Sequence, residues 1–335
     1  MAETFPVGVV TPAQEELEAR DFVELGRLAE SEGFHAFTVG EIAGFDAFAV
    51  LAATAATTTR IRLGTAVIPI YTRAPTLAAM GYASLASIAP GRVIAGFGTG
   101  SHRIVEDWQG FELRQPLQTM REYVSIVRAA LAGERVDRPE GLLRVRDFRL
   151  QHPAFPPVPI LIGAFNPSML RLAGEIADGV VFALWPPDQL PPLIALVREG
   201  AERAGRDPDS IEIVGTVHAY SGSRVDEAVE RLRRLVLEYS VRPTHRPAFE
   251  ASFPEIDRAT ELWNRGERRE ALALVPDEAV HYGFAIGKPE VVLERLESAR
   301  RAGVTLPMVQ PHALERGKAD AVFETVRAVG AALRG

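Results

Sequence analysis

The chain has 335 residues, of which 24% are charged and 47% hydrophobic, and its formal net charge is −7. The negative charge argues against a nucleic-acid-binding protein that relies on a strong positive field, and no apolar run of about 18 residues predicts a membrane span. The absence of cysteine excludes disulfides, thiol catalysis and thiolate-bound metal. We expect no nucleic acid and no membrane as partners, no secretory signal, and a cytoplasmic location.

Short β-branched and apolar runs bounded by turn residues recur along the chain, which is the pattern of strands. The eight runs are Pro6–Val10, His35–Val39, Ile61–Ile70, Arg92–Phe97, Val158–Ile162, Gly179–Leu184, Ile211–Val217 and Val304–Val309. Stretches of helical period lie between them, for example at residues 123–131. The alternation predicts an α/β fold, a (β/α)8 TIM barrel forming a single domain over residues 1–335. A doubly wound sheet is the alternative, but the first turn carries no dinucleotide fingerprint.

Two segments are longer than a βα unit requires. Residues 133–157 contain the alternating run Leu143–Phe148, which predicts an extra strand or hairpin. Residues 218–287 contain a helix at Val225–Tyr239, an irregular Pro- and Arg-rich stretch and a second helical run. Insertions of this length are commonly lids or binding loops, so we predict a substrate lid. His245 and Arg246 would meet an anionic substrate there, or else they simply face solvent.

The active site of a barrel lies at the carboxyl ends of its strands, and a glycine-rich turn follows the fourth strand. Gly98, Thr99 and Gly100 come here, immediately before Ser101 and His102. Glycines let backbone N–H groups approach an anion closely, so the turn is a candidate phosphate site. The spacing is not that of a dinucleotide or Walker motif, and a plain strand-to-loop turn explains it equally well.

A second candidate phosphate site follows the fifth strand. Gly163, Ala164 and Asn166 precede a predicted helix start at Pro167 or Ser168. The first amides of such a helix point back toward the strand end and favour an anion. A helix cap without a ligand is the alternative.

Acidic and imidazole side chains also follow predicted strands. Glu41 ends the second strand and is our first candidate for proton transfer, and His102 is the second. A capping or salt-bridged role is the alternative for Glu41, and we expect Asp46 to cap a helix. His218 and His312 also stand near strand ends, where a core role is the default. No two histidines have the spacing of a local metal site, so we predict no metal.

These segments together resemble the bacterial-luciferase-like superfamily of flavin- and deazaflavin-dependent oxidoreductases. The resemblance rests on Arg60–Val67, Ser87–Gly100, Arg121–Val124, Pro159–Ala164 and Leu172–Gly179. It implies that a flavin-type ring lies over the barrel mouth and that a non-prolyl cis peptide joins Ala66 to Val67. The cofactor-binding residues that it implies are Gly40, Thr65, Ala66, Val67, Gly98, Thr99, Gly100, Gly163, Ala164 and Asn166.

The segment Val39–Phe48 is similar to the methylenetetrahydromethanopterin-reductase-like subgroup, which uses the deazaflavin F420. This chain has Gly40-Glu41 where many such enzymes carry Asp-His. The resemblance therefore implies an F420-dependent oxidoreductase that moves a hydride between the deazaflavin C5 and a small organic substrate. One alternative is a monooxygenase that uses reduced FMN from a separate flavin reductase, and another is a barrel that only binds a ligand. Relatives commonly pair, so we expect a homodimer.

Overall fold

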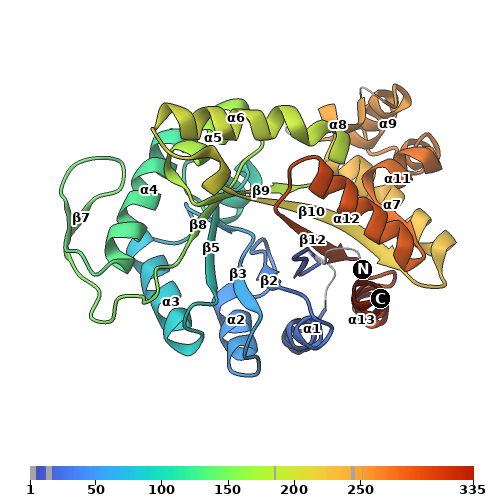
Figure 1. Cartoon of the computed structure of the whole chain (residues 1–335). Coiled ribbons are helices and arrows are strands. Elements are labelled where there is room, and N and C mark those ends of the chain that lie inside the picture. Colours follow the sequence, from blue (N-terminus) through green and yellow to red (C-terminus); the bar gives the residue numbers. More distant parts are fainter. Residues whose placement is uncertain (1–4, 13–16, 185, 243–245, 251) are drawn as a thin grey trace.

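A computed structural model describes residues 5–12, 17–184, 186–242, 246–250 and 252–335. Its centre is a closed barrel of parallel strands (Figure 1). The barrel strands are β1 (Gly8–Val10), β2 (Ala36–Val39), β3 (Arg62–Thr65) with β4 (Ile68–Pro69), β5 (Val93–Gly98), β8 (Ile160–Gly163), β9 (Gly179–Ala183), β10 (Glu212–Ser221) and β12 (Leu306–Pro311). β10 pairs with β9 and β12, and β12 pairs with β1, which closes the sheet. The predicted (β/α)8 barrel is confirmed.

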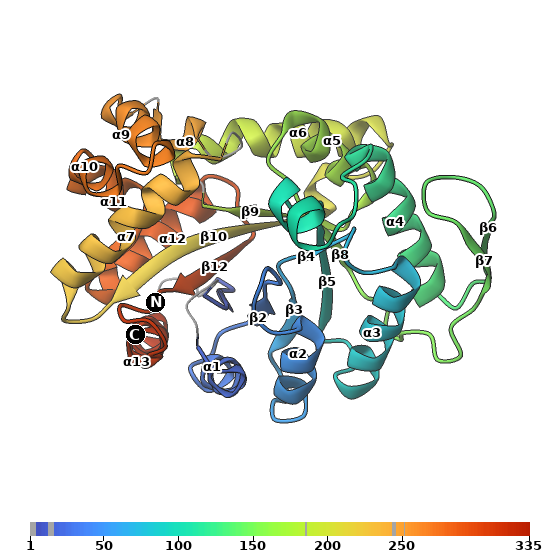
Figure 2. The same cartoon turned by 180° about the vertical axis from the view of Figure 1, so that it is seen from behind.

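Helices form an outer layer around these strands (Figures 1 and 2). They are α1 (Ala19–Ser31), α2 (Ala47–Ala55), α3 (Pro75–Ile88), α4 (Pro116–Leu131), α5 (Pro167–Ile176), α6 (Leu190–Arg203), α12 (Pro289–Arg301) and α13 (Asp320–Arg334), with short turns η2 (Pro187–Gln189) and η3 (Pro208–Ser210). The apolar stripe predicted at residues 123–131 forms the buried face of α4. The last helix packs beside the first, where Arg334 forms an ion pair of 2.7 Å with Glu32.

The third barrel strand is interrupted. The prediction of one continuous strand at Ile61–Ile70 is wrong, because the structure divides it into β3 and β4. The peptide bond between Ala66 and Val67, which lies in the gap, is cis, as the family resemblance implied. β3 pairs with β2 and β5, whereas β4 pairs with β5 alone. The interruption therefore turns the backbone at the carboxyl end of this strand, where the active site of a barrel is expected.

Alternate residues of each strand point into the barrel, where they pack as a separate apolar cluster. Its buried members are Val10, Ala36, Ile94, Leu161, Val181, Val214, Leu306 and Met308, and Ala66 and Val67 pack against it. Near the amino ends of the strands, Arg62 on β3 and Glu212 on β10 form an ion pair of 2.6 Å. The barrel interior toward the amino ends of the strands is thus filled by side chains of the strands themselves.

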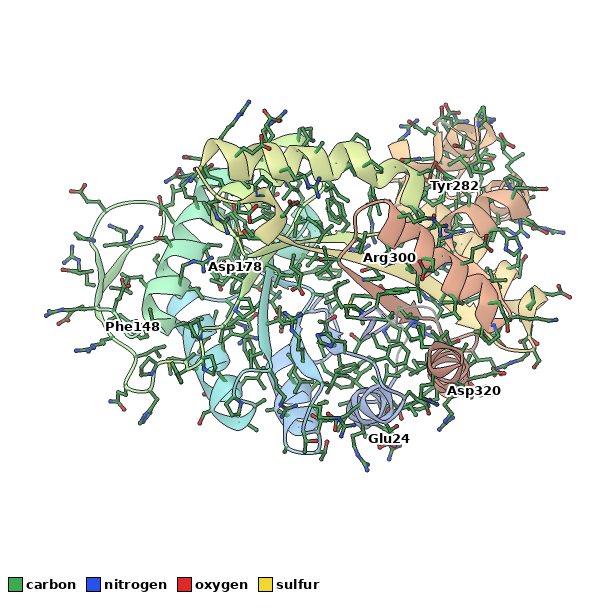
Figure 3. All side chains as sticks on the ribbon, viewed as in Figure 1. Glu24, Phe148, Asp178, Tyr282, Arg300 and Asp320 are labelled. Atoms are coloured by element: carbon green, nitrogen blue, oxygen red, sulfur yellow. The ribbon has the colours of Figure 1, made fainter. Side chains whose placement is uncertain are left out.

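The first insertion is the predicted hairpin. β6 (Val136–Arg138) and β7 (Val145–Phe148) pair antiparallel as a separate two-stranded sheet. They stand beyond α4 at one side of the barrel, and the labelled Phe148 marks this side in Figure 3. Because the hairpin follows α4 and precedes β8, it joins the barrel at the amino ends of the strands, away from the candidate phosphate turns.

The second insertion is helical and lies at the opposite side of the molecule (Figures 2 and 3). It contains α7 (Val225–Ser240), α8 (Pro247–Glu250), α9 (Glu255–Asn264), α10 (Arg268–Ala273), α11 (Asp277–Gly283) and a short strand, β11 (Ala285–Gly287). At the approximate limits predicted for this insertion, residues 218 and 287, β10 continues to Ser221 and its last residues pair with β11. His245 lies outside the described residues, and Arg246 forms ion pairs with Glu250 and Asp257.

Candidate active site

The carboxyl ends of the barrel strands, which we call the mouth, carry a wall without side chains. A Cβ placed on Gly98 would lie 2.6 Å from Cγ2 of Val67, and one on Gly163 would lie 3.3 Å from both its γ carbons. A Cβ on Gly40 would lie 3.3 Å from the carbonyl oxygen of Ala66. We call Gly40, Gly98 and Gly163 the glycine wall. Because these positions carry no side chain, the Val67 side chain and the Ala66 carbonyl can approach the neighbouring strand ends closely.

Thr65, a predicted cofactor-binding residue, fastens this wall from behind. Its hydroxyl donates to the carbonyl oxygen of Gly96 at 2.7 Å, accepts from the Gly96 amide at 3.0 Å and lies 2.6 Å from the hydroxyl of Tyr82. Tyr82 is fully buried, and burial raises its pKa, so it stays a neutral phenol. The Thr65 hydroxyl is thus already satisfied within the protein, and Thr65 acts by joining β3 to β5.

The two candidate phosphate turns lie side by side, because β5 and β8 are neighbours and Phe97 pairs with Ile162. In the first turn, Gly98 is buried, Thr99 is half-buried and Gly100 is exposed. Gly100 has a φ of +72°, a backbone conformation that residues with a side chain rarely adopt. The turn leads into a π-helical segment, η1 (Arg103–Trp108). The structure therefore brings together two groups of residues that are about 65 positions apart in the chain.

The second turn passes through Gly163 and the buried Ala164 to the start of α5, which begins at Pro167 as predicted. The side chain of Asn166 accepts a hydrogen bond of 2.9 Å from the Met169 amide and so forms the N-cap. The backbone of Asn166 is extended, with φ −97°, which any residue can adopt. The cap leaves the start of the helix, with its partial positive charge, at the mouth.

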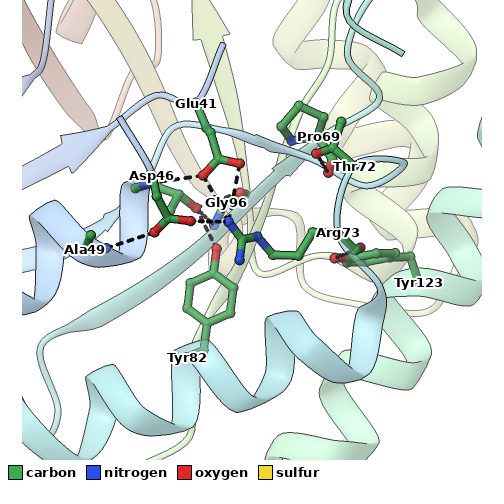
Figure 4. A network of polar contacts seen from close by, with 11 residues as sticks. Glu41, Asp46, Ala49, Pro69, Thr72, Arg73, Tyr82, Gly96 and Tyr123 are labelled. Atoms are coloured by element: carbon green, nitrogen blue, oxygen red, sulfur yellow. Dashed lines mark hydrogen bonds and ion pairs between the residues drawn. The ribbon is translucent and has the colours of Figure 1, made fainter. Parts of the chain in front are cut away.

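Glu41 lies at the mouth beside the interrupted strand. Its amide donates to the carbonyl oxygen of Val67 at 3.2 Å, which ties it to the cis peptide. Its carboxylate oxygen Oε2 accepts from the Ala47 amide at 3.1 Å and from the Arg73 guanidinium at 3.3 Å (Figure 4). The salt-bridged role weighed for Glu41 is therefore confirmed. The other oxygen, Oε1, has only a contact of 3.5 Å with Arg73, so it is the better placed to accept a proton.

Arg73 is shared between two carboxylates, because it also binds Asp46 at 2.6 Å. Asp46 accepts from the Ala49 amide at 2.9 Å, so the prediction that it caps a helix is confirmed. Although partial burial opposes the shift, this amide and Arg73 lower the pKa of Asp46 below its usual value. In turn, despite desolvation, Asp46 and Glu41 raise the pKa of Arg73. One cation between two anions leaves this group with a net charge of about −1.

His102, the second candidate for proton transfer, lies on the surface. Its side chain is 78% exposed and its Nδ1 lies 3.1 Å from a carboxylate oxygen of Glu106 on η1. In the described part of the chain, no hydrogen bond or ion pair joins His102 to another predicted site residue. The structure thus brings Glu41, Ala66 and Val67 together at the mouth and leaves His102 on its outer edge.

A buried pair of histidines stands on another part of the mouth. Nδ1 of His218, on β10, lies 2.9 Å from Nε2 of His312, which follows β12, and the two rings are stacked. Tyr239 of α7 and Phe284 pack edge-on against His218. Both histidines stand near predicted strand ends, but the sequence does not predict their contact because 94 positions separate them. Among the described residues, no group of three acidic or histidine side chains could hold a metal ion.

Substitution of Asp46 tests how the charged group of Glu41, Arg73 and Asp46 contributes to stability. We expect Asp46→Ala to lower the free energy of unfolding by about 1 kcal/mol near neutral pH, because α2 loses its N-cap acceptor. Asp46→Asn keeps an acceptor but loses the charge facing Arg73. Since the folded protein lowers the pKa of Asp46, that charge stabilises the fold above about pH 4, and the effect is lost as the pH falls further.

Urea unfolding of the wild type and Asp46→Asn over a series of pH values measures this effect. The difference in unfolding free energy between them should be largest near neutral pH and should shrink on acidification. A difference that is independent of pH would show that the charge of Asp46 contributes nothing.

Comparisons of the sequence with known proteins point to one family, and comparison of the fold agrees with it. Residues 5–306 match the family model described as luciferase-like monooxygenase. A Mycobacterium tuberculosis protein named as a coenzyme F420-dependent oxidoreductase is 29% identical over 89% of this chain and 92% of its own length. The 5,10-methylenetetrahydromethanopterin reductase of Archaeoglobus fulgidus is 28% identical, with coverage of 83% and 86%. The structure of the F420-dependent tetrahydromethanopterin reductase from Methanopyrus kandleri matches the fold with a TM-score of 0.83, at 23% identity and 98% coverage of both chains.

Among the described residues, no helix has the length and apolar character of a membrane span.

Proposed function

The chain belongs to the luciferase-like monooxygenase family, and from that premise we propose that it is an F420-dependent oxidoreductase. It would move a hydride between C5 of the deazaflavin and a small organic substrate with a C=C, C=N or alcohol/carbonyl group. The observation that carries the proposal is the packing of Val67 against the glycine wall, beside the cis peptide. The relative named as a coenzyme F420-dependent oxidoreductase, which aligns with 89% of the chain, supports the choice of cofactor.

The residues at the mouth fit such a cofactor. The surface formed by Ala66, Val67 and the glycine wall would hold the ring, with Thr65 supporting it from behind. Two sets of residues would bind the phosphate, namely Gly98, Thr99 and Gly100 on one side and Gly163, Ala164 and Asn166 on the other. When bound, the deazaflavin supplies a carbon centre that gives or takes a hydride and does not readily activate oxygen.

A side chain of the protein itself would accept or donate the proton of the substrate. Glu41 is held by the Ala47 amide and by Arg73 through Oε2, which leaves Oε1 to accept or return the substrate proton. General acid–base catalysis requires a positioned group of this kind within hydrogen-bond reach of the substrate. The helices α7–α11 would cover the substrate as a lid and exclude water. The cytoplasmic location stays a prediction.

Titration of the purified protein with F420 and with FMN tests the cofactor, with tryptophan fluorescence as the readout. We expect saturable quenching by F420 at concentrations where FMN has little effect. A preference for FMN would instead favour a monooxygenase supplied by a separate flavin reductase. If neither compound binds, the protein is not an oxidoreductase of this type, and the barrel binds some other ligand.

Substitution of Glu41 tests the proton-transfer step. With the first substrate that a screen identifies, we expect Glu41→Gln to lower kcat by about 100-fold or more, because the amide cannot accept a proton. The dissociation constant of F420 should stay within about twofold, since the side chain keeps its shape. The exposed His102, changed to Gln, is the comparison. A larger loss of kcat in His102→Gln than in Glu41→Gln would transfer the role to His102.

We also propose that the protein is a homodimer that pairs through α2 and α3. Neither helix contains a charged residue, and helices that are apolar all round are normally buried. Yet Leu77, Met80 and Ile88 of α3 are 49%, 49% and 48% exposed. At intervals of three and eight residues they lie on one outer face of the helix. A second copy of the chain would cover this face.

Light scattering during gel filtration tests the dimer. We expect the wild type to have twice the mass of one chain and the double variant Leu77→Glu, Met80→Glu to be monomeric, because a charged interface core is disfavoured. Leu117→Glu, at an exposed apolar position of α4, should remain dimeric. A wild type with the mass of one chain would rule out the homodimer.

A further inference from the structure

Two uncharged polar side chains, on β2 and β12, flank the apolar Val10 of β1 near the mouth. Thr38 on β2 pairs with Val10 on β1, and the same register places Val10 beside Gln310 on β12. Inward-facing residues alternate along each strand, and Ala36, Val10 and Met308 all belong to the cluster inside the barrel. Thr38 and Gln310 therefore also point into the barrel, one step closer to its mouth than Ala36 and Met308.

Thr38 has a buried hydroxyl without a partner. Its residue exposure is 4%, and no described residue forms a hydrogen bond with its Oγ1. The buried hydroxyls of Ser221 and Thr260 are also unpaired, whereas those of Thr65 and Thr325 are hydrogen-bonded. A buried polar group left unpaired costs about 1–3 kcal/mol, and native proteins contain few of them. An unpaired hydroxyl that faces the interior of the mouth is therefore explained best by a ligand.

Gln310 differs from Thr38, because its side-chain amide is not among the fully buried unpaired groups. Gln310 is 7% exposed, and within the described part of the chain no hydrogen bond to its side-chain amide is formed. The strand register places it beside His218 of β10, so it lies next to the histidine pair. Thr38 and Gln310 are both uncharged at every pH, so neither offers the cation that a phosphate or carboxylate prefers. Their ligand should present an uncharged polar edge.

We propose that Thr38 and Gln310 bind the imide edge of the cofactor ring, the C=O, N–H, C=O sequence that flavins and deazaflavins share. This inference rests on the proposed function. A hydroxyl both donates and accepts, and a carboxamide offers one acceptor and two donor hydrogens, so the pair can satisfy an edge on which acceptors and a donor alternate. Thr38 and Gln310 stand on β2 and β12, whereas the glycine wall extends over β2, β5 and β8. A ring lying on the wall would thus direct one polar edge toward them.

The variant Thr38→Val tests the proposal, because it removes the hydroxyl and keeps the shape. Two measurements are made on purified protein, the melting temperature without ligand and the dissociation constant for F420. The ligand-free variant should melt at the same temperature as the wild type or higher, since it loses an unpaired polar group. Its dissociation constant for F420 should rise about tenfold, as expected for one lost hydrogen bond to a ligand. Thr38→Ser, which keeps the hydroxyl, should restore most of the affinity.

Thr325→Val is the matched control, because Thr325 is equally buried but its hydroxyl accepts from the Ser221 amide and donates to the carbonyl oxygen of Ala321. It should lower the melting temperature and leave the affinity for F420 unchanged. Gln310→Leu should weaken F420 binding as Thr38→Val does. An unchanged dissociation constant in both Thr38→Val and Gln310→Leu overturns the inference, and so does a fall in melting temperature of Thr38→Val as large as that of Thr325→Val.

The wild type separates this inference from the proposed function. If the wild type binds F420 and the two variants bind it equally well, only the inference fails. If the wild type prefers FMN, the variants are measured with FMN, which carries the same imide edge, and a tenfold loss supports the inference while the choice of deazaflavin fails. If the wild type binds neither compound, the proposed function and this inference fail together.

Discussion

The contact of Val67 with Gly98 and Gly163 is the constraint on which the mouth of this barrel depends. A side chain on Gly98 would occupy the place of the Val67 methyl groups, so the chain can turn inward after β3 only where the neighbouring strands carry glycine. Thr65 completes the arrangement from behind by bonding both the amide and the carbonyl of Gly96. The same turn positions the carbonyl oxygen of Val67 to receive the amide of Glu41. The turn after β3 thus positions both the proposed cofactor surface and Glu41, the candidate base.

The two sides of the mouth differ in chemistry, and this difference divides their roles. Around β3, β5 and β8 the side chain of Val67 packs against glycines, and two turns suited to a phosphate follow. On β2 and β12 the inward side chains nearest the mouth, Thr38 and Gln310, are uncharged and polar, and Thr38 has no partner of its own. The charged group of Glu41, Arg73 and Asp46 lies at the edge between them. A ring with one phosphate arm and one imide edge matches this distribution of groups.

Much of this architecture can be predicted from the sequence, because it depends on local periodicity. All eight barrel strands, the hairpin at β6 and β7 and the start of α5 follow from patterns that repeat within a few residues. The glycine-rich turns were equally visible. The cis peptide came from the family resemblance, since Gly64 and Pro69 indicate at most a bulge in this strand.

The contacts between distant segments could not be predicted, because barrel closure and strand register create them. Glu41 meets Arg73 from 32 positions away, and His218 meets His312 from 94. In the sequence Thr38 is an ordinary strand residue, and only the structure shows that its hydroxyl lacks a hydrogen-bond partner. The surface position of His102 could not be predicted for a related reason, since its contact with Glu106 depends on how η1 leaves the turn. β10 extended further than predicted because β11, about 65 positions later, supplies its pairing.

A crystal structure of the protein with bound F420 tests the central claim most directly. The account predicts that the ring lies against Ala66 and Val67, with its phosphate between the turn at Gly98–Gly100 and the start of α5 at Asn166. It also predicts that the polar edge of the ring lies within hydrogen-bond distance of Thr38 and Gln310. A ring that lies away from Val67, or a phosphate bound on another side of the barrel, would contradict the account.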